Sequence, residues 1–293
     1  MAIASYLLLF FEKKAEKFER YLSSVYIYSK NMNSPLLELI FLSEKRKDLI
    51  LFLNKGPKTI EQIKKYMNSS AVAVLPQLKK LRDESLVFKT DDVYILSPLG
   101  VAVAGRMQAV VNLLTVFGNC YEYWANHAID CIPLSLRSRI GELCNCTFSE
   151  PPDRTRLFEP HREFVENLAI SKRINGIASI FHPLYPSFFL TLAKKGVDIS
   201  ILVTRPVYER IKEEYRTEFR EFINFRNACF YVCDEKIEFS HAVTDSFLSL
   251  SLPFSDGTFD HKQDVMGFDP VALQWGEDLF AYYRDRSEKI TEI

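Results

Sequence analysis

Between residues 57 and 98, the spacing of apolar and polar positions changes from that of helices to that of strands. Thr59 and Gln62 have the spacing of a capping box, so a helix is predicted to begin there. The apolar residues of this helix recur three or four positions apart: Ile60, Ile63 and Met67. The pattern predicts a short amphipathic helix that ends at the polar turn 68–70.

A second helix and a hairpin are predicted after this turn. The helix extends to about Glu84, and two short β-prone runs at 86–89 and 93–96 then enclose a polar tip at 90–92. A further helix is predicted before them, over residues 35–53. Whether residues 43–46 divide it into two helices stays open. Helix, turn, helix and hairpin are typical of a winged helix-turn-helix, whose second helix enters the DNA major groove.

The second helix separates into two faces when successive residues are placed about 100° apart. The face predicted to pack inward combines Ala71, Leu75, Leu78 and Arg82, flanked by Val74 and Leu81. The face predicted to point outward combines Ser70, Ala73, Gln77 and Lys80, with Pro76 at its edge. Proline removes one helical hydrogen bond, so Pro76 is expected to bend the helix or to delay its start.

The outward face indicates how DNA would be contacted. Gln77 is expected to pair with adenine through two hydrogen bonds, and Lys79 or Lys80 to contact phosphate or guanine. The predicted DNA-binding residues, including the turn and the hairpin, are Ser69, Ser70, Ala73, Gln77, Lys79, Lys80, Lys89 and Thr90. Solvated helices also have polar faces, and winged helices that bind only proteins share this element order, so a protein-interaction module stays an alternative.

The charge of the chain is distributed unevenly. Residues 33–100 carry 11 Lys and Arg against 8 Asp and Glu, whereas residues 101–293 carry 21 against 27. Because DNA affinity depends on neutralising phosphates, the basic first region is the better candidate for DNA binding. The length of 293 residues allows more than one domain.

A helix predicted over about 99–117 is apolar on more than one side. Its apolar residues include Val101, Val103, Met107, Val110, Leu113 and Leu114. Such a helix needs a second packing partner. The same helix of a second subunit is one such partner, which predicts a homodimer, and burial between two domains is the alternative.

From residue 172 the chain alternates between strand and helix patterns. Strands are predicted at 174–181, 197–203, 228–233, 237–244 and 247–252, and helices at 183–195, 206–225 and 269–289. This order predicts parallel pairing followed by antiparallel hairpins. The predicted fold class is α+β multidomain: an N-terminal winged helix-turn-helix, a helical connector and a C-terminal α/β sensory domain with a mixed sheet.

No catalytic motif stands out in the sequence, which has no phosphate-binding glycine loop, no GxSxG and no HExxH. Ligands of open α/β sheets bind at the carboxyl ends of strands, where His182 and Thr204 are predicted to lie. Together with Asp245 and Trp275 they are the candidate ligand-binding residues of a pocket for a small-molecule effector. Asp245 as part of a turn and Trp275 as a core anchor are the structural alternatives.

An enzyme is the rival interpretation of this domain. It would act on a nucleotide or phosphodiester with His182 as the base. We favour a non-enzymatic sensor without cofactor or metal. Cys144 and Cys146 form a bare CxC without the spacing of a zinc site, and a redox role for them stays open.

The first 31 residues have an apolar start that is too short to span a membrane and lacks the basic residues of a secretory signal. Met32 is predicted to be the functional start, with an N-terminal helix for dimerisation or membrane contact as the alternative. Because the sequence shows no secretory signal, we expect a cytoplasmic protein. The predicted domains are an extension at 1–31, a winged module at 32–104, a helical connector at 105–170 and a sensing domain at 171–293.

Several segments resemble one family of proteins. They include KRKDLILFLNKGPKTIEQIKKYMN, LVFKTDDVYILSPLG, GVDISILVT, VTDSFLSLSLPFSDGTFD and FDPVALQWGEDLFAYYRDRSE. Together they are similar to the archaeal, ArsR-like winged-helix transcriptional regulators typified by the methanogenesis and filamentation regulator of methanogens. The resemblance covers nearly everything from Met32 onward. It implies a DNA-binding, dimeric regulator with a C-terminal sensory domain, and double-stranded operator DNA as its partner.

Overall fold

The computed structural model describes residues 35–149 and 161–292. The chain divides into two compact units, one ending at Gln108 and the next starting at Ala109. Residues 1–31, the predicted extension, lie outside the described residues.

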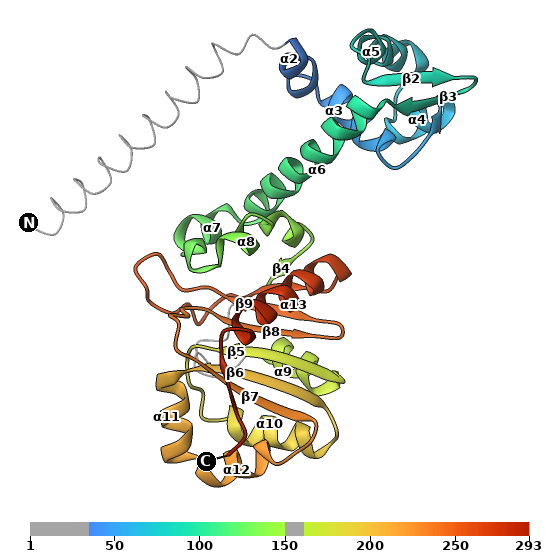
Figure 1. The fold of residues 1–293 in the computed structure, drawn as a ribbon. Coiled ribbons are helices and arrows are strands. Elements are labelled where there is room, and N and C mark those ends of the chain that lie inside the picture. The colour runs from blue at the N-terminus through green and yellow to red at the C-terminus, as the bar shows by residue number, and fades with distance from the viewer. Residues whose placement is uncertain (1–34, 150–160, 293) are drawn as a thin grey trace, which may run out of the picture. The chain divides into compact units, whose positions relative to one another are not determined.

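The first unit consists of a helical bundle and a small sheet (Figure 1). Its elements are α2 (Pro35–Phe41), α3 (Glu44–Leu53), β1 (Lys58–Thr59), α4 (Ile60–Tyr66), α5 (Ala71–Asp83), β2 (Val87–Thr90) and β3 (Val93–Leu96). The strands pair antiparallel in the order β1-β3-β2. This order of elements is that of a winged helix-turn-helix, in which α4 and α5 are the two helices of the motif and β2 and β3 form the wing.

Local sequence signals account for the boundaries of these helices. The Thr59 hydroxyl accepts a hydrogen bond from the Gln62 N–H at 3.3 Å, and the Gln62 side chain accepts one from the Thr59 N–H at 2.9 Å, which confirms the capping box. Ser43 caps α3, so the segment predicted at 35–53 forms two helices. The core between the helices is aliphatic: Leu49, Ile50, Leu53, Ile63, Val74, Leu78 and Leu81 are buried.

Helix α6 (Pro98–Asn119) begins in the first unit and ends in the second. Gly100 allows its first turn to approach the hairpin, since a Cβ there would lie 2.1 Å from the Leu86 carbonyl oxygen. By length and composition alone, α6 is apolar enough to cross a membrane. Arg106 is exposed near its middle, however, where a membrane-spanning helix rarely carries a charge.

The second unit contains an eight-stranded mixed sheet in the order β11-β7-β6-β5-β8-β9-β10-β4 (Figure 1). The strands are β4 (Thr147–Phe148), β5 (Arg173–Ala178), β6 (Asp198–Thr204), β7 (Ala228–Cys233), β8 (Ser240–Thr244), β9 (Leu248–Ser251), β10 (Val265–Gly267) and β11 (Glu288–Ile290). β5, β6 and β7 are parallel, whereas β8 pairs antiparallel with both β5 and β9. The predicted mixed sheet is therefore present, with β4, β10 and β11 as strands that the sequence pattern did not indicate.

Both faces of this sheet are covered by helices. The α-helices of the unit after α6 are α7 (Tyr121–Asn126), α8 (Leu134–Arg137), α9 (Arg162–Ile170), α10 (Tyr185–Lys194), α11 (Arg205–Glu214), α12 (Arg216–Ile223) and α13 (Pro270–Arg284). α9 to α12 share one core with the sheet, while α7, α8 and α13 share the other. Successive side chains of β6 point to opposite faces of the sheet. Ile201 and Val203 therefore pack in the first core and Leu202 in the second.

Two details differ from the expected elements. The helix predicted at 206–225 is interrupted at Tyr215, which separates α11 from α12. The terminal helix ends at Arg284, and the residues after it turn back to form β11 on the sheet edge.

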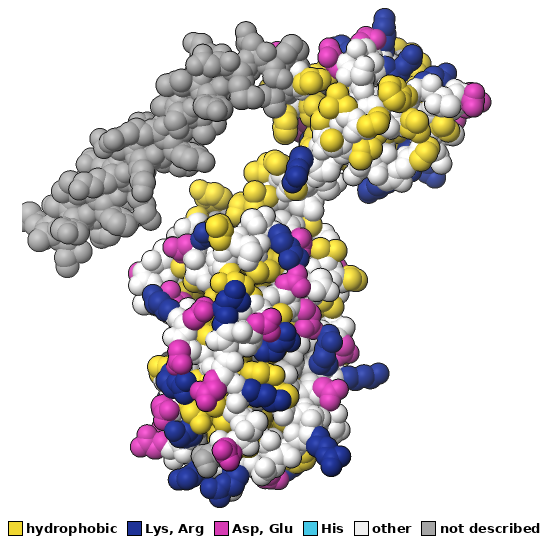
Figure 2. Space-filling view, in the orientation of Figure 1, with side chains coloured by type: hydrophobic (Ala, Val, Ile, Leu, Met, Phe, Trp, Pro, Cys, Tyr) yellow, Lys and Arg dark blue, Asp and Glu magenta, His cyan; other side chains and the backbone are white. Residues whose placement is uncertain are grey.

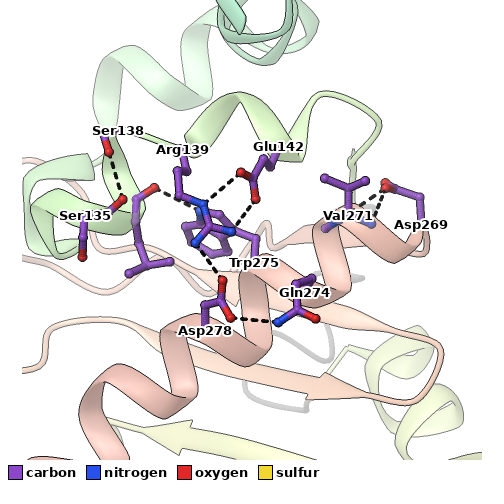
Figure 3. A network of polar contacts seen from close by, with 11 residues as sticks. Ser135, Ser138, Arg139, Glu142, Asp269, Val271, Gln274, Trp275 and Asp278 are labelled. Atoms are coloured by element: carbon purple, nitrogen blue, oxygen red, sulfur yellow. Dashed lines mark hydrogen bonds and ion pairs between the residues drawn. The ribbon is translucent and has the colours of Figure 1, made fainter.

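Residues 109–148, expected to belong to a helical connector, pack on the sheet of the second unit. Tyr123, Trp124 and Leu136 are buried in the same core as α13. A polar network fastens this segment to α13 (Figure 3). In it, the Arg139 guanidinium donates to Glu142 at 2.9 and 2.8 Å and to Asp278 at 2.7 Å. The segment is thus an integral layer of the second unit.

Candidate functional site

The exposed face of α5 differs from the one predicted. Val74, Leu78 and Leu81 form the buried side, so the packing stripe is centred on Val74 and Leu78 instead of running through Leu75 and Arg82. Leu75 is 44% exposed and Val72 is 84% exposed. The exposed residues of the helix are Val72, Leu75, Pro76, Lys79, Lys80, Arg82 and Asp83. Apolar character had suggested an inward position for Leu75, but the core of this small unit is already filled by its neighbours.

Lys79 and Lys80 are the predicted DNA-contacting residues that α5 presents most openly. Both side chains are exposed, and neither takes part in an ion pair among the described residues. Pro76 lies on the same exposed side, and α5 nevertheless begins at Ala71 and continues through it. Two adjacent ammonium groups on an exposed helix face are suited to phosphate contacts.

Gln77 is half-buried and engaged within the unit. Its side-chain carbonyl accepts a hydrogen bond from the Arg46 guanidinium of α3 at 3.0 Å, and Arg46 also donates to the Leu39 carbonyl. The two-bond pairing with adenine uses both the carbonyl and the amino group of glutamine. Base reading by Gln77 would therefore require Arg46 to release the carbonyl. Sequence reasoning missed Arg46, because nothing in helical spacing connects α3 with α5.

Ser69 and Ser70 form the end of the turn before α5, and Ala73 lies in the first turn of that helix. The Ser69 hydroxyl donates to the Met67 carbonyl at 3.0 Å, whereas Ser70 occupies the N-cap position without a side-chain capping bond. Ser70 is exposed and Ala73 is half-buried. Because Ser70 makes no side-chain capping bond, the first N–H groups of α5 have no side-chain acceptor from the cap, an arrangement suited to a phosphate oxygen.

The hairpin carries charges of both signs. Lys89 and Thr90 are exposed at the end of β2, and the Lys89 ammonium lies 6.0 Å from the centre of the Tyr94 ring. The next two residues, Asp91 and Asp92, are exposed at the tip, and Asp91 adopts φ 52°, as hairpin turns require. Two carboxylates at the tip limit how closely the wing can approach a phosphate.

Apolar side chains are also prominent on the first unit. Figure 2 shows hydrophobic side chains gathered over its visible face, whereas charges of both signs are spread over the visible face of the second unit. The large exposed apolar residues of the first unit include Phe41, Leu42, Val72, Leu75, Phe88, Leu99 and Val101. A surface of this composition favours contact with a second apolar surface as well as with DNA.

His182 and Thr204 lie where the sequence predicted them, just after β5 and at the end of β6, on the carboxyl side of the parallel strands. His182 lines a cavity of about 500 Å³ at this edge. Its ring packs on Tyr185, with ring centres 4.8 Å apart. Thr204 is the N-cap residue of α11 and does not line that cavity.

The structure does not bring Asp245 together with His182. β8 runs antiparallel to β5, so the residue after β8 lies beside the start of β5, at the opposite end of the strands from His182. There the Asp245 carboxylate accepts hydrogen bonds from the backbone N–H groups of Lys172 at 2.8 Å and Arg173 at 3.3 Å. Burial opposes the charge, but these N–H groups favour it, and the pKa of Asp245 is lowered from its usual value. The carboxylate thus fixes the chain at the start of β5.

Trp275 is also separate from that cavity. Its side chain is fully buried between α13 and the segment 121–143, and its indole N–H donates to the Leu136 carbonyl at 3.0 Å. Figure 3 shows Trp275 on α13 together with the Arg139 network. This environment is that of a core anchor, in which the polar edge of the indole is satisfied by backbone.

The CxC cysteines have the properties of protonated thiols. Burial raises the pKa of Cys146 to about 12 and raises the pKa of Cys144 in the same direction. Across residues 35–149 and 161–292, no group of three or more His, Cys, Asp or Glu side chains is placed to hold a metal ion.

Family models match both units of the chain. The model described as methanogenesis regulatory protein FilR1, N-terminal domain, matches residues 35–115, and the middle-domain model of the same protein matches residues 157–286.

Curated relatives agree with this match. The methanogenesis regulatory protein FilR1 of Methanothrix harundinacea (strain 6Ac) is 22% identical over 254 residues, which are 85% of this chain and 57% of that protein. The HTH-type transcriptional activator ArnR of Sulfolobus acidocaldarius is 32% identical over 72 residues, which are 24% of this chain and 27% of that protein. The chain thus spans little more than half the length of the first relative and a quarter of the second.

Among solved structures, the archaeal chromatin protein TrmBL2 aligns over 89% of this chain and 100% of its own length, with a TM-score of 0.40 and 14% identity. ZitR of Lactococcus lactis aligns over 36% of this chain and 80% of its own, with a TM-score of 0.25 and 19% identity. The family assignment rests on the two domain models and on FilR1 itself. This chain belongs to the FilR1 family of archaeal helix-turn-helix transcriptional regulators.

Proposed function

We propose that this chain is a sequence-specific, DNA-binding transcriptional regulator whose helix α5 enters the major groove of its operator. The observation that supports this most is the exposed Lys79-Lys80 pair on the second helix of a complete winged helix-turn-helix. Lysines at this position neutralise phosphates on either side of the groove while the helix reaches the base edges. Such a protein acts on the chromosome and therefore in the cytoplasm.

A selection from genomic DNA tests the proposal. The purified chain is incubated with fragments of a methanogen genome at two salt concentrations, and the retained fragments are sequenced. We expect a few promoters to be enriched at both concentrations and to share a symmetric motif. Retention of all fragments at low salt and none at moderate salt would indicate nonspecific binding only and would contradict an operator-reading function.

Gln77→Ala is expected to change sequence preference more than overall affinity. Loss of the side-chain amide removes discrimination at one adenine position, which is worth roughly 10-fold or more in relative affinity. A competition experiment with a library randomised at each operator position measures this. Lys80→Ala is the comparison, because removing an ammonium group from a phosphate weakens all sequences alike and flattens the salt dependence. An equal loss on every sequence for Gln77→Ala would contradict base reading.

The regulator is proposed to be a homodimer joined along α6. Three large apolar residues of that helix are at least 41% exposed and lie within about 60° of one another at 100° per residue: Leu99, Val110 and Leu114. Covering them with the same helix of a second chain removes apolar surface from water and places two α5 helices for a two-fold operator. Sedimentation of the full chain at micromolar concentration is expected to give the dimer mass. A monomer throughout that range would contradict the proposal.

A small-molecule signal is proposed to act through the second unit. The support is the cavity at the carboxyl edge of β5 and β6, where His182 lies, because open α/β sheets bind ligands at this edge. A ligand changes DNA binding only by binding the DNA-competent state with a different affinity from the other state.

A protein-interaction winged helix is the second candidate function, favoured by the exposed apolar side chains of α5 and β2. Val72, Leu75 and Phe88 together present a surface that DNA does not require. The two functions differ in salt dependence. Retention on DNA falls steeply as salt rises, whereas apolar contact with a protein changes little.

A further inference from the structure

A cavity of about 500 Å³ lies at the carboxyl edge of β5 and β6, entirely within the second unit. Its walls come from β5, β8 and β9, from the segment before β10 and from the aromatic residues around the start of α10. Its volume is within the range of pockets that hold small organic ligands. One end of the cavity is polar and the other is apolar.

The polar end is built around the carboxyl group of Asp264. This residue is 8% exposed. One of its carboxyl oxygens accepts a hydrogen bond from the Ser251 hydroxyl and the other from the Ser249 hydroxyl at 3.3 Å. The Asp264 backbone is held by Ser149, whose hydroxyl accepts from the Asp264 N–H at 2.8 Å and whose N–H donates to the Asp264 carbonyl at 2.9 Å. The carboxyl group is therefore fixed in place on the cavity wall.

Asp264 differs in this respect from the other carboxyl group on the wall. Asp260 lies 3.0 Å from the buried ring of His127, and its second oxygen accepts from the Lys262 N–H at 2.8 Å. Asp264 receives its two side-chain hydrogen bonds from neutral hydroxyls. Burial raises its pKa, while these hydroxyls and the nearby His161 act in the opposite direction. A cation bound beside it would restore the stability of the ionised form.

The charge of the cavity wall selects among ligands. Among the described residues that line it, the acidic side chains are Asp260 and Asp264, and no lysine or arginine is present. The other titratable side chains of the wall are imidazoles, those of His161, His182, His241 and His261. An anionic group of a ligand would thus face carboxyl groups without a permanent positive charge to offset them. An ammonium group would instead form a charge-assisted hydrogen bond with Asp264, one of the stronger contacts that proteins make.

The apolar end continues into a smaller hollow of about 60 Å³ between the sheet and helices α10 to α12. Among the residues that the structure describes, the two share seven lining residues: Ala178, Ile180, Phe181, His182, Tyr185, Phe189 and Ile201. Beyond them the smaller hollow is lined by side chains that include Val207, Phe219, Phe222 and Phe230. An aromatic or branched aliphatic group fits such surroundings.

We propose that this cavity binds a small organic amine, with its ammonium group on Asp264 and its aromatic or branched aliphatic body toward Phe181 and Phe189. This inference rests on the proposed function, since it names the chemical class of the effector and the side chain that recognises it. The ligand has a positive end and an apolar end, and a molecule of the same shape with a carboxylate in place of the amine is rejected.

The test uses the full chain and matched probes. Tryptamine, phenethylamine and isoamylamine are each compared by calorimetry with the alcohol and the carboxylate of the same carbon skeleton. We expect at least one amine to bind about tenfold or more tighter than its alcohol and its acid, since a charge-assisted hydrogen bond is worth at least that ratio. Failure of every amine to bind, or equal or tighter binding of the alcohol or acid, overturns the proposal.

Variants assign the preference to Asp264. Asp264→Asn keeps the size of the side chain and is expected to remove the preference for the amine, while Asp198→Asn, an exposed carboxylate at the start of β6, keeps it. An amine preference that is unchanged in Asp264→Asn overturns the assignment to Asp264. If Asp264→Asn does not fold, Ala178→Leu tests the cavity itself, because Ala178 lines both hollows and a larger side chain there is expected to abolish amine binding. Unchanged amine binding by Ala178→Leu overturns the cavity as the binding site.

The same preparation separates this inference from the proposed function. DNA retention is measured without amine, and then with the tightest-binding amine. DNA retention without amine binding contradicts the cavity proposal alone. Amine discrimination without DNA retention supports the cavity and contradicts the regulator.

Discussion

The double substitution Lys79→Ala with Lys80→Ala is expected to weaken DNA binding by roughly 100-fold at a fixed moderate salt concentration, since each charge-assisted contact contributes about tenfold. The loss should be similar for operator and unrelated DNA, because these side chains are expected on phosphates. The plot of log affinity against log salt concentration should become shallower by about 2, because each phosphate that is no longer neutralised keeps its counterion. Fluorescence anisotropy with a labelled duplex at several salt concentrations measures both quantities.

A matched control removes the same charge elsewhere. Lys195 and Lys289 are exposed in the second unit, at the end of α10 and in β11, so Lys195→Ala with Lys289→Ala changes the net charge by the same amount. The control should bind DNA nearly as tightly as the unaltered chain. An equal loss in both double variants would mean that net charge governs binding, and α5 would then not be the contact surface.

Signals that act within a few residues were sufficient to predict most elements. The Thr59-Gln62 capping box fixed the start of α4, and the strand at 228–233 was predicted with its observed bounds. Both depend on local chemistry, namely the hydrogen bonds of a helix end and a run of residues favoured in strands. Strands of two or three residues, such as β4 and β10, lack enough positions to show a period, and only their partners in the sheet define them.

Interactions between distant segments account for what was missed in the candidate sites. The buried face of α5 differs from the predicted one because α3 and the hairpin fill the small core. Helical spacing within α5 alone cannot predict which face they cover. The separation of Asp245 from His182 follows from the antiparallel pairing of β8 with β5. The polar end of the cavity depends on Asp264, which lies in a segment without periodicity and reaches Ser249 and Ser251 only through the fold.

Trp275 illustrates how the structure separates two explanations for one residue. As a ligand-binding residue it would line a cavity and leave its N–H for the ligand. Instead the side chain is fully buried, and its N–H is bonded to the Leu136 carbonyl on the layer that Arg139 also fastens to α13 (Figure 3). Its expected contribution is therefore to the stability of the second unit.

Trp275→Ala is expected to lower the free energy of unfolding of the second unit by about 3–5 kcal/mol, the usual cost of removing a large buried aromatic side chain. Trp275→Phe should cost less, roughly 1–3 kcal/mol, because it keeps most of the apolar volume but leaves the Leu136 carbonyl without its donor. Urea unfolding followed by the fluorescence of Trp124, the other tryptophan of the chain and itself buried in this unit, measures each variant.

Val271→Ala provides the matched control on the same helix. Val271 is 53% exposed, so its replacement should change the free energy of unfolding by less than about 0.5 kcal/mol. If Trp275→Ala unfolds at the same urea concentration as this control, the indole is not a core anchor. If that stable variant also fails to bind the amine, Trp275 would be assigned to the ligand site. If the variant unfolds much earlier, α13 depends on the indole to hold the layer formed by residues 121–143 on the sheet.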